Sequence, residues 1–477
     1  MANIKSLVKD TAVYGLSSII GRFLNWLLVP LYTKMLLTGE YGVVTNVYAY
    51  VALLLVILTY GMETGFFRFI NGKETREPMK VYSSSLIALA ATSTLFIVLV
   101  ATFLEPISRA LDVEAHPAYA MMMAVTVAVD AFTSMPFAYL RYKKRPLKFA
   151  TLKCVGIGIN IGLNLLFFRV IYNPEIGVGY IFFANLLASV IMVPLLLREL
   201  TGFRWTMDWG LLKRMLVYSF PLLILGLAGN MNQNLDKILL PYLVSDKADA
   251  MSQLGIYGAC CKVALVMMMF TQAFRYAYEP FIFAQHRKEG GDNMGAYSDA
   301  MKYFVIFAMV IFLGVMFYMP VLQNFIDAKY RSGLQVVPIV MIGDVLFGVF
   351  YNLSVWYKLT DKTIWGTWFS LAGLAVTIAL NVMLVPRFGY MGCAWTAFAC
   401  YGVMMIASYL VGQAKYPLRY PVGRIGAYFF GALLLFGIGQ AVNTGNQWLD
   451  MAARTPLLLI YLLAITKFEH IPLISKR

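Results

Sequence analysis

Three ionisable side chains lie deep inside long apolar stretches of this 477-residue chain: Arg22, Asp130 and Lys262. If those stretches cross a membrane, each charge costs several kcal/mol in hydrocarbon, so it normally faces a water-filled cavity or a partner of opposite charge. Arg22 lies about ten residues into the first stretch, which at 1.5 Å per residue is roughly 15 Å deep. These positions predict a polar cavity inside the membrane with a cation near its centre.

Each of these charges also has a structural explanation. Asp130 either pairs with Arg22 as a structural bridge or acts as a protonatable switch. Lys262 either adds a second cation to the cavity or extends its side chain to the membrane surface. Arg68 and Arg275 stand near the cytoplasmic ends of the second and eighth stretches, where they either bind an anionic head group or follow the charge bias of cytoplasmic loops.

A run of polar residues occupies the seventh apolar stretch. Helical spacing places Asn230, Gln233 and Lys237 on one face and Asn232 and Asp236 on another. Because such a helix is unusual against lipid, we expect it to line an aqueous path, although Asp236 and Lys237 near its outer end could instead anchor it at the interface. The candidates for cavity lining or ion coupling are Asp130, Asn230, Gln233, Asp236 and Lys237.

Cations outnumber anions in the predicted cavity, which favours an anionic substrate. Arginine binds phosphate through several donors that stay charged at all relevant pH values. A lipid-linked pyrophosphate fits this chemistry, because its head group needs a cationic passage while its lipid tail can remain in the bilayer. The candidate substrate-binding cations are Arg22, Lys262, Arg275 and Arg68.

The elements that must position these residues are membrane-spanning helices. Hydrophobic residues make up 60% of the chain and charged residues 13%, with a mean hydropathy of +0.70. About fourteen apolar stretches have the roughly 20 residues that a helix needs to cross a bilayer, and a lipid-exposed span must satisfy its own backbone polar groups. The predicted spans are 12–32, 41–62, 82–104, 117–140, 150–171, 177–197, 215–244, 254–283, 301–322, 334–356, 364–385, 390–412, 422–442 and 451–466.

The loops between these spans predict an orientation. Most of the 39 Lys and Arg residues fall on one side, together with both termini, which places the termini in the cytoplasm. The opposite side carries the acidic connection with Glu105, Asp112 and Glu114. Topology alone therefore explains the net charge of +15, and we expect no nucleic-acid partner.

Catalysis and metal binding are not expected. The spans and short connections leave no room for a catalytic domain outside the bilayer, so we expect no enzyme. All five cysteines lie inside spans without metal-ligand spacing and are interpreted as apolar packing residues, so we expect no metal and no cofactor.

Two copies of a six-span unit are visible in the sequence. Residues 163–166 followed by 177–180 match residues 380–383 followed by 389–392. An even number of spans leaves the copies in the same orientation, which predicts two bundles as parallel pseudo-repeats facing a central cavity. The predicted domains are a bundle at 1–205, a bundle at 206–415 and two additional helices at 416–477.

Small residues on the fifth span form a GxxxG pattern at Gly158 and Gly162. This pattern is typical of helices that pack closely against a neighbour. We therefore expect a close helix contact there.

Three segments together carry a resemblance to a known family. They are LYTKMLLTGEYGVVTNVYAYV (31–51), DKILLPYLVS (236–245) with the following 254–281, and PRFGYMGCAWTAFACYGV (386–403). The chain resembles the polysaccharide flippases of the Wzx type, in the larger group that includes the multidrug and toxin extruders and the lipid II flippase. The resemblance covers essentially the whole chain.

The resemblance implies a transporter that moves an undecaprenyl-pyrophosphate-linked oligosaccharide across the bacterial inner membrane by alternating access. The oligosaccharide would be an O-antigen, capsule or exopolysaccharide repeat unit. The implied partners are this lipid-linked substrate, membrane lipids, a polysaccharide polymerase and other assembly proteins. The similar lipid II flippase carries cavity arginines on its first, second and eighth spans, whose nearest counterparts here are Arg22, Arg68 and Arg275.

Two other functions are compatible with parts of the sequence. A cation-coupled multidrug extruder of the same fold often has an acidic residue on its first or seventh span, and here the first span carries Arg22 while the seventh carries Asp236. A membrane-embedded glycosyl transferase or polymerase usually needs a sizeable extracytoplasmic loop, and every predicted outer loop is short. The flippase is therefore the favoured function.

Overall fold

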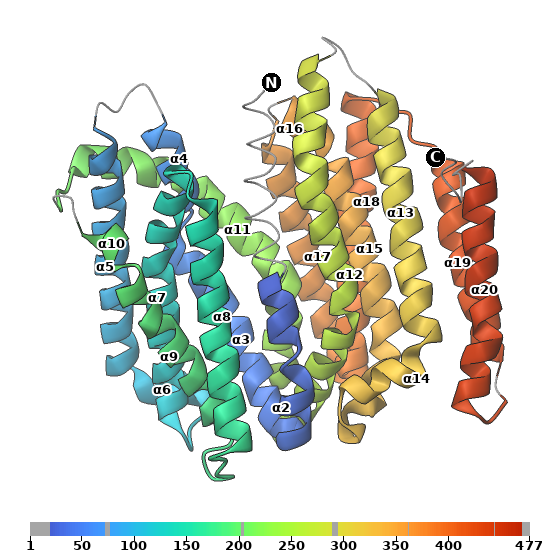
Figure 1. The fold of residues 1–477 in the computed structure, drawn as a ribbon, viewed down its shortest axis with the longest axis horizontal. Helices are drawn as coiled ribbons and strands as arrows, with labels where there is room; N and C mark the ends of the chain where they lie inside the picture. Colours follow the sequence, from blue (N-terminus) through green and yellow to red (C-terminus); the bar gives the residue numbers. More distant parts are fainter. Residues whose placement is uncertain are drawn as a thin grey trace. The chain divides into compact units, whose positions relative to one another are not determined.

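The computed structural model describes residues 20–71, 77–201, 205–288, 294–360, 362–442 and 444–469, which form helices and connecting turns (Figure 1). Twelve candidate spans in this part are long and apolar enough to cross a membrane, and α9 (Gly179–Leu195) is a shorter apolar helix. The chain is thus a multi-pass, all-α membrane protein, as its sequence predicts. Residues 1–19 and 470–477, which include both termini and most of the first half of the first predicted span, lie outside the described residues.

Every predicted span after the first overlaps a helix of the structure. The helices are α2 (Val29–Met35), α3 (Thr38–Thr59), α4 (Met62–Ile70), α5 (Pro78–Thr102), α6 (Leu104–Ala110), α7 (Pro117–Tyr142), α8 (Pro146–Arg169), α9, α10 (Leu197–Leu200), α11 (Trp209–Leu243), α12 (Lys247–Lys288), α13 (Met294–Phe317), α14 (Met319–Leu322), η1 (Gln323–Phe325), η2 (Ala328–Gln335), α15 (Val336–Leu353), α16 (Val355–Leu359), α17 (Ile364–Phe388), α18 (Tyr390–Lys415), α19 (Val422–Ala441) and α20 (Gln447–Phe468).

Local sequence signals set where several helices begin. Pro78, Pro117 and Pro146 each stand at the first position of a helix, where a proline needs no backbone donor and already has a helical φ angle. Asp208 caps α11 by accepting a hydrogen bond of 2.9 Å from the backbone N–H of Leu211. The start of each of these helices is therefore fixed by one residue type.

A break between α3 and α4 redirects the chain. Tyr60 and Gly61 both have left-handed backbone conformations, with φ angles of 33° and 68°. Two such residues in succession end α3, because a right-handed helix cannot continue through them. The chain then re-enters a helix at Met62, with Glu63 in the first turn of α4.

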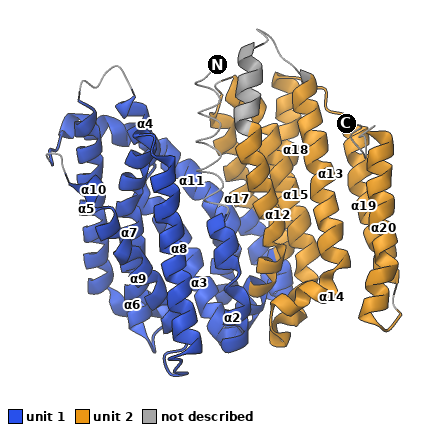
Figure 2. Ribbon diagram, viewed as in Figure 1, with its two compact units in different colours: residues 1–258, 377–393 blue, residues 259–376, 394–477 orange. Residues whose placement is uncertain are grey.

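The described chain divides into two compact units (Figure 2), residues 1–258 with 377–393 and residues 259–376 with 394–477. In unit 1, α7 packs against α3, α5 and α9. Of its most apolar 18-residue stretch, 61% is buried, against 22% for α8. Helix α7 is therefore the centre of unit 1, and α8 exposes an apolar side suited to lipid.

In unit 2, α13 takes the central position. It packs against α15, α19 and α20, and 67% of its most apolar stretch is buried, against 17% for each of α19 and α20. The end of α20 is attached by a polar contact, since Glu469 accepts hydrogen bonds from Lys302 of α13 and Tyr428 of α19. The two final helices therefore pack on α13 and leave large apolar surfaces for lipid.

Two glycines outside the GxxxG pattern allow a close contact between α3 and α12. A Cβ atom on Gly42 of α3 would lie 1.9 Å from the carbonyl oxygen of Met251, and one on Gly255 of α12 would lie 1.9 Å from the carbonyl oxygen of Thr38. By contrast, a Cβ on Gly158 or Gly162 would meet no described atom within 4 Å. The close packing predicted for these two glycines is therefore not seen among the described residues.

Gly42→Ala should destabilise the protein, because its methyl group would overlap a backbone carbonyl that cannot rotate away. Overpacking of this kind costs about 1–3 kcal/mol or more, so the Tm in detergent should fall by several degrees. Gly158→Ala is the matched control and should leave the Tm unchanged or slightly raised, since alanine favours helix and the space is open. Equal Tm values for the two variants would contradict the close contact between α3 and α12.

The orientation can be tested with single cysteines in a variant that lacks the five native ones. Glu114 lies in the predicted outer connection between α6 and α7, and Arg145 lies in the predicted cytoplasmic connection between α7 and α8; both are exposed. Glu114→Cys should react with a membrane-impermeant maleimide in intact cells, whereas Arg145→Cys should react only after permeabilisation. The reverse pattern would invert the predicted topology.

Candidate functional site

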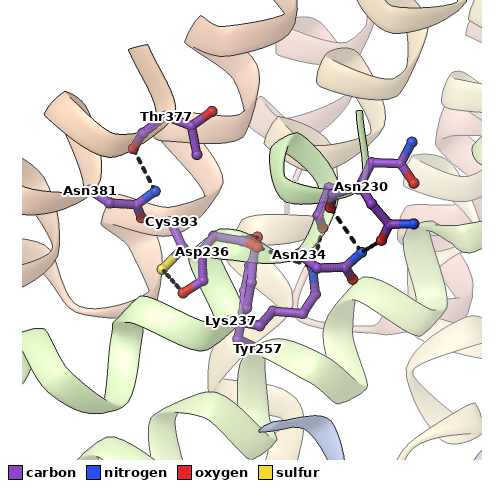
Figure 3. A network of polar contacts seen from close by, with 9 residues as sticks. Asn230, Asn234, Asp236, Lys237, Tyr257, Thr377, Asn381 and Cys393 are labelled. Carbon is purple, nitrogen blue, oxygen red and sulfur yellow. Dashed lines mark hydrogen bonds and ion pairs between the residues drawn. The ribbon is translucent and has the colours of Figure 1, made fainter. Parts of the chain in front are cut away.

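The polar run of α11 forms a connected network around Asp236 (Figure 3). Asp236 is only 5% exposed, and its carboxylate accepts a 2.7 Å hydrogen bond from the hydroxyl group of Tyr257. Its other carboxylate oxygen lies 3.2 Å from the Lys237 Nζ atom. The negative charge of Asp236 is therefore neutralised and hydrogen-bonded inside the protein.

The rest of the run divides into two sides, as helical spacing predicts. Asn232 and Asp236 are buried, whereas Asn230, Gln233 and Lys237 are partly exposed. Lys237 bends back to donate a 2.8 Å hydrogen bond to the carbonyl oxygen of Gln233. This arrangement keeps the Lys237 ammonium group on the partly exposed side while it contacts Asp236.

Residues from α17 and α18 complete the network. The Cys393 thiol lies 3.7 Å from the carbonyl oxygen of Asp236, and the Asn381 side-chain amide donates a 2.8 Å hydrogen bond to the carbonyl oxygen of Thr377. The Thr377 hydroxyl and the Asn381 side-chain oxygen are buried and have no hydrogen-bond partner among the described residues. The Thr377–Asn381 pair therefore holds two oxygens without a described partner, in the same close view as the contact between Cys393 and Asp236 (Figure 3).

A second polar region is a cavity of about 680 Å³ inside unit 1. Its charged lining consists of Glu63 of α4, Asp130 and Arg141 of α7, and Lys153 of α8. The remaining lining is Asn25, Leu55, Val56, Thr59, Gly61, Thr133, Ser134, Phe137, Phe149, Gly156, Ile157, Asn160, Asn185, Ala188, Ser189 and Met192. One cavity thus contains two carboxylates and two cations.

The charges of this cavity differ in their partners. Arg141 of α7 forms an ion pair with Glu63 of α4. Lys153 places its ammonium group 4.0 Å from the centre of the Phe137 ring and forms no ion pair with a described residue. Asp130 accepts a 2.7 Å hydrogen bond from the Ser189 hydroxyl. Lys153 is therefore a cation that an anionic ligand can approach.

The charged groups of the cavity lie at different depths from the predicted cytoplasmic side. Asp130 lies close to the middle of α7, and Arg141 lies at its last turn, on the side predicted to be cytoplasmic. Lys153 lies about two turns into α8 from Pro146, which brings it between these levels. The cavity therefore extends from a charged end toward the predicted middle of the membrane.

The structural bridge considered for Asp130 does not form with any described residue. Its hydrogen-bond partner is Ser189, and Asp130 makes no ion pair with the part of the chain that the structure describes. Arg22 is exposed on helical residues 20–26, one turn before the cavity-lining Asn25. Because residues three apart share a helix face, Arg22 lies on the side of its helix that also carries Asn25.

The other predicted cations are distributed over both units. Arg68 of α4 is exposed, and its guanidinium group lies 4.1 Å from the centre of the Tyr218 ring. Lys262 of α12 is exposed, in unit 2. Arg275, also in unit 2, lies 4.9 Å from the centre of the Tyr351 ring and lines a pocket of about 20 Å³. That pocket has room for about one water molecule, so it does not accommodate a head group. The meeting of these four cations in one cavity stays a prediction.

Sequence reasoning missed Glu63, Arg141 and Lys153 as cavity residues. It counted both Arg141 and Lys153 with the basic residues of the cytoplasmic side, although Lys153 lies near the start of the predicted span 150–171. The proline at position 146 could have revealed the error, since a proline typically occupies the first turn of a helix, which places Lys153 about two turns inside α8. No group of three or more His, Cys, Asp or Glu suited to a metal ion occurs among the described residues.

Comparison with known families decides which protein class carries these two polar regions. The family described as "Polysaccharide biosynthesis protein" matches residues 7–283, more than half of the chain. The chain belongs to this family. The resemblance to the Wzx-type family is thereby confirmed.

Solved structures show the fold that this family member shares. The structure "Lipid II flippase MurJ, inward closed conformation" is 12% identical, with a TM-score of 0.78 over 96% of this chain and 99% of that chain. A multidrug resistance MATE family transporter of the MOP superfamily, in an inward-facing conformation, is 14% identical, with a TM-score of 0.68 over 85% of this chain and 94% of that chain. No curated protein matches the chain. The fold is therefore like that of MurJ and the MATE transporters.

The Asp236 network can be tested by removing its charges one at a time. Asp236→Asn should destabilise this family member by at least about 2 kcal/mol, because it leaves the nearby Lys237 ammonium group without its carboxylate. The double variant Asp236→Asn/Lys237→Met should recover part of the loss, since it removes the unpaired charge as well. Thermal unfolding in detergent measures both effects.

Asp246→Asn is the control, because Asp246 is exposed at the connection before α12. It should leave the Tm within about a degree of the original value, as surface substitutions usually do. A double variant no more stable than Asp236→Asn would mean that Asp236 and Lys237 do not act as a pair.

Proposed function

We propose that this transporter is a flippase for undecaprenyl-pyrophosphate-linked oligosaccharides, the repeat units of an O-antigen, capsule or exopolysaccharide. The observation that carries the proposal is the polar cavity of unit 1, in a chain whose family serves polysaccharide biosynthesis. A lipid-linked substrate requires a passage for its polar head and none for its tail. A cavity walled by membrane-spanning helices meets that requirement.

The charges of the cavity suit a pyrophosphate. Arg141 is already paired with Glu63, so it holds the charged end of the cavity together and binds an added anion less strongly than an unpaired cation would. The Lys153 ammonium group contacts the Phe137 ring, and no carboxylate of a described residue lies within ion-pair distance of it. Its ammonium group is therefore the cation with which a pyrophosphate would pair first, and Arg22, Arg68, Arg275 and Lys262 are proposed as further cations along the path.

Transport in this proposal follows alternating access in the bacterial inner membrane, with both termini in the cytoplasm. The chain would have fourteen spans, arranged as two six-helix bundles at 1–205 and 206–415 that are parallel pseudo-repeats, with two further helices at 416–477. Membrane lipids, a polysaccharide polymerase and other assembly proteins are the partners we expect. The likeness to MurJ over nearly the full length of both chains supports this arrangement.

Asp236 is our candidate for ion coupling. It is buried, and its contacts with Tyr257 and Cys393 join α11 to α12 and α18. A proton or a sodium ion bound there would compete with Lys237 for the carboxylate. Such competition would change the contact between α11 and its neighbours, which is what a coupling site has to do.

A cation-coupled multidrug extruder is the second candidate function. The specific observation in its favour is Asp130, a carboxylate that lines this cavity within a fold that MATE transporters share. A cationic drug would pair with Asp130, whereas Lys153 in the same cavity would repel it. The second observation makes the flippase the better supported function.

Transfer of a fluorescent short-chain polyprenyl-pyrophosphate oligosaccharide across liposomes tests the proposal. The purified protein should accelerate transfer, and Lys153→Met should slow it by about tenfold or more, because a charge-assisted contact worth roughly 1.4 kcal/mol or more is lost. Arg22→Ala, measured alongside, tests the cation predicted from the first span.

Lys143→Met is the matched control, since Lys143 is exposed at the end of α7 and does not line the cavity. It should transfer the probe within about twofold of the unaltered protein. Equal slowing by both lysine variants would remove Lys153 from the substrate path. No transfer by the unaltered protein, together with faster dye efflux from cells that overproduce it, would favour the extruder.

A further inference from the structure

The cavity of unit 1 contains two chemically different regions. Its charged end carries Glu63, Arg141 and Lys153, which the proposed function uses for the pyrophosphate. Its deeper lining includes Asn160, Asn185 and Ser189, together with Asp130. The deeper region is therefore rich in uncharged hydrogen-bonding groups, which the pyrophosphate does not explain.

These deeper groups form a preorganised chain of hydrogen bonds across three helices. Asn185 of α9 donates to the hydroxyl group of Tyr48 on α3, and its side-chain oxygen accepts a 3.1 Å hydrogen bond from Asn160 of α8. Asn164, one turn further along α8, donates to the side-chain oxygen of Asn160 at 3.3 Å. The orientation of each amide is thereby fixed before any ligand binds.

The same groups keep unused hydrogen-bonding capacity. A side-chain amide has two N–H donors, and Asn160 uses one of them toward a described residue. Ser189 donates its proton to Asp130, which leaves its oxygen able to accept. The second carboxylate oxygen of Asp130 accepts no hydrogen bond from a described residue. Donors and acceptors are thus present side by side, which is the combination that a hydroxyl group satisfies.

The size of the cavity agrees with a ligand larger than an ion. Its volume of about 680 Å³ falls within the range of roughly 300–1,000 Å³ that small-molecule sites occupy. A proton or a single cation would leave nearly all of this space to water. A ligand with several hydroxyl groups would instead use the volume and the mixed donors and acceptors together.

We propose that the deeper region of this cavity is a carbohydrate subsite, in which Asn160, Asn185 and Ser189 with Asp130 bind the hydroxyl groups of the sugar next to the pyrophosphate. The inference rests on the proposed function, because it assigns the head group of the same substrate to a second region of the same cavity. The pyrophosphate lies at Lys153 near the charged end, and the sugar extends toward the middle of α7. Selectivity among head groups then arises here, since a site built to hydrogen-bond hydroxyl groups discriminates against a ligand that lacks them.

The test compares sugar-bearing and bare probes on the full-length purified protein. The probes are citronellyl diphosphate alone and citronellyl diphosphate carrying glucose, galactose, N-acetylglucosamine or N-acetylgalactosamine. At least one sugar-bearing probe should bind about tenfold more tightly than the bare probe. Asn185→Ala/Ser189→Ala should reduce that advantage to about twofold or less and leave the affinity for the bare probe within about twofold.

Asn46→Ala/Ser93→Ala is the matched control, because both residues are buried in unit 1 and neither lines the cavity. It should keep the sugar advantage, and thermal unfolding should confirm that both double variants are folded. Asp130→Asn keeps an acceptor oxygen for Ser189 and should also retain most of the advantage.

The outcomes separate this inference from the function on which it rests. If the unaltered protein binds bare and sugar-bearing probes equally, or if the Asn185/Ser189 variant keeps the advantage, the carbohydrate subsite is refuted while the pyrophosphate site stands. Loss of the advantage in Asp130→Asn with retention in the Asn185/Ser189 variant would place the sugar contact at the Asp130 carboxylate and overturn the role of Asn185 and Ser189. Binding of neither kind of probe would overturn the proposed function and the subsite together.

Discussion

The structure depends on one constraint: polar groups inside a membrane-spanning bundle have to find partners within the protein or in a cavity that holds water. In unit 1 this constraint acts around α7, the most enclosed of its helices. Asp130 reaches Ser189 on α9, and Asn185 connects Tyr48 with Asn160. These contacts fasten α3, α7, α8 and α9 to one another where the surrounding side chains are apolar.

Backbone geometry determines where the cavity can receive charge. The left-handed pair Tyr60 and Gly61 ends α3 early and starts α4 in a new direction, which brings Glu63 to the cavity. If α3 continued without this break, Glu63 would lie further along the axis of α3. The ion pair between Glu63 and Arg141 then ties the redirected helix to the end of α7. A local backbone feature thus produces a charged opening that no single helix could form.

Sequence reasoning reached the helices more easily than the site. A span is a local property, because twenty apolar residues in succession reveal it without knowledge of any neighbour, and every predicted span after the first meets a helix. The cavity is a non-local property. Asp130 was found because a carboxylate inside an apolar run is conspicuous, but its partner Ser189 is an ordinary residue in α9. Lys153 was missed because a lysine near the start of the predicted span 150–171 was counted with the basic residues of the cytoplasmic side. Gly42 was missed because its contact with α12 depends on two segments that are distant in the sequence.

Two carboxylates of the spans, Asp236 and Asp130, occupy environments that favour different tasks. Asp236 is enclosed and already has Tyr257 and Lys237 as partners, so a cation that reaches it has to displace existing contacts. Asp130 faces a large cavity with one oxygen uncommitted, so a ligand can bind it without breaking any contact. A cation that binds Asp236 has to break the contact with Tyr257 or Lys237, so its binding is coupled to a rearrangement of the helices that carry them. A ligand that binds Asp130 breaks no contact, so its binding has no such coupling. This difference in local bonding is the physical reason to place coupling at Asp236 and head-group recognition at Asp130, although both residues are single carboxylates within apolar sequence.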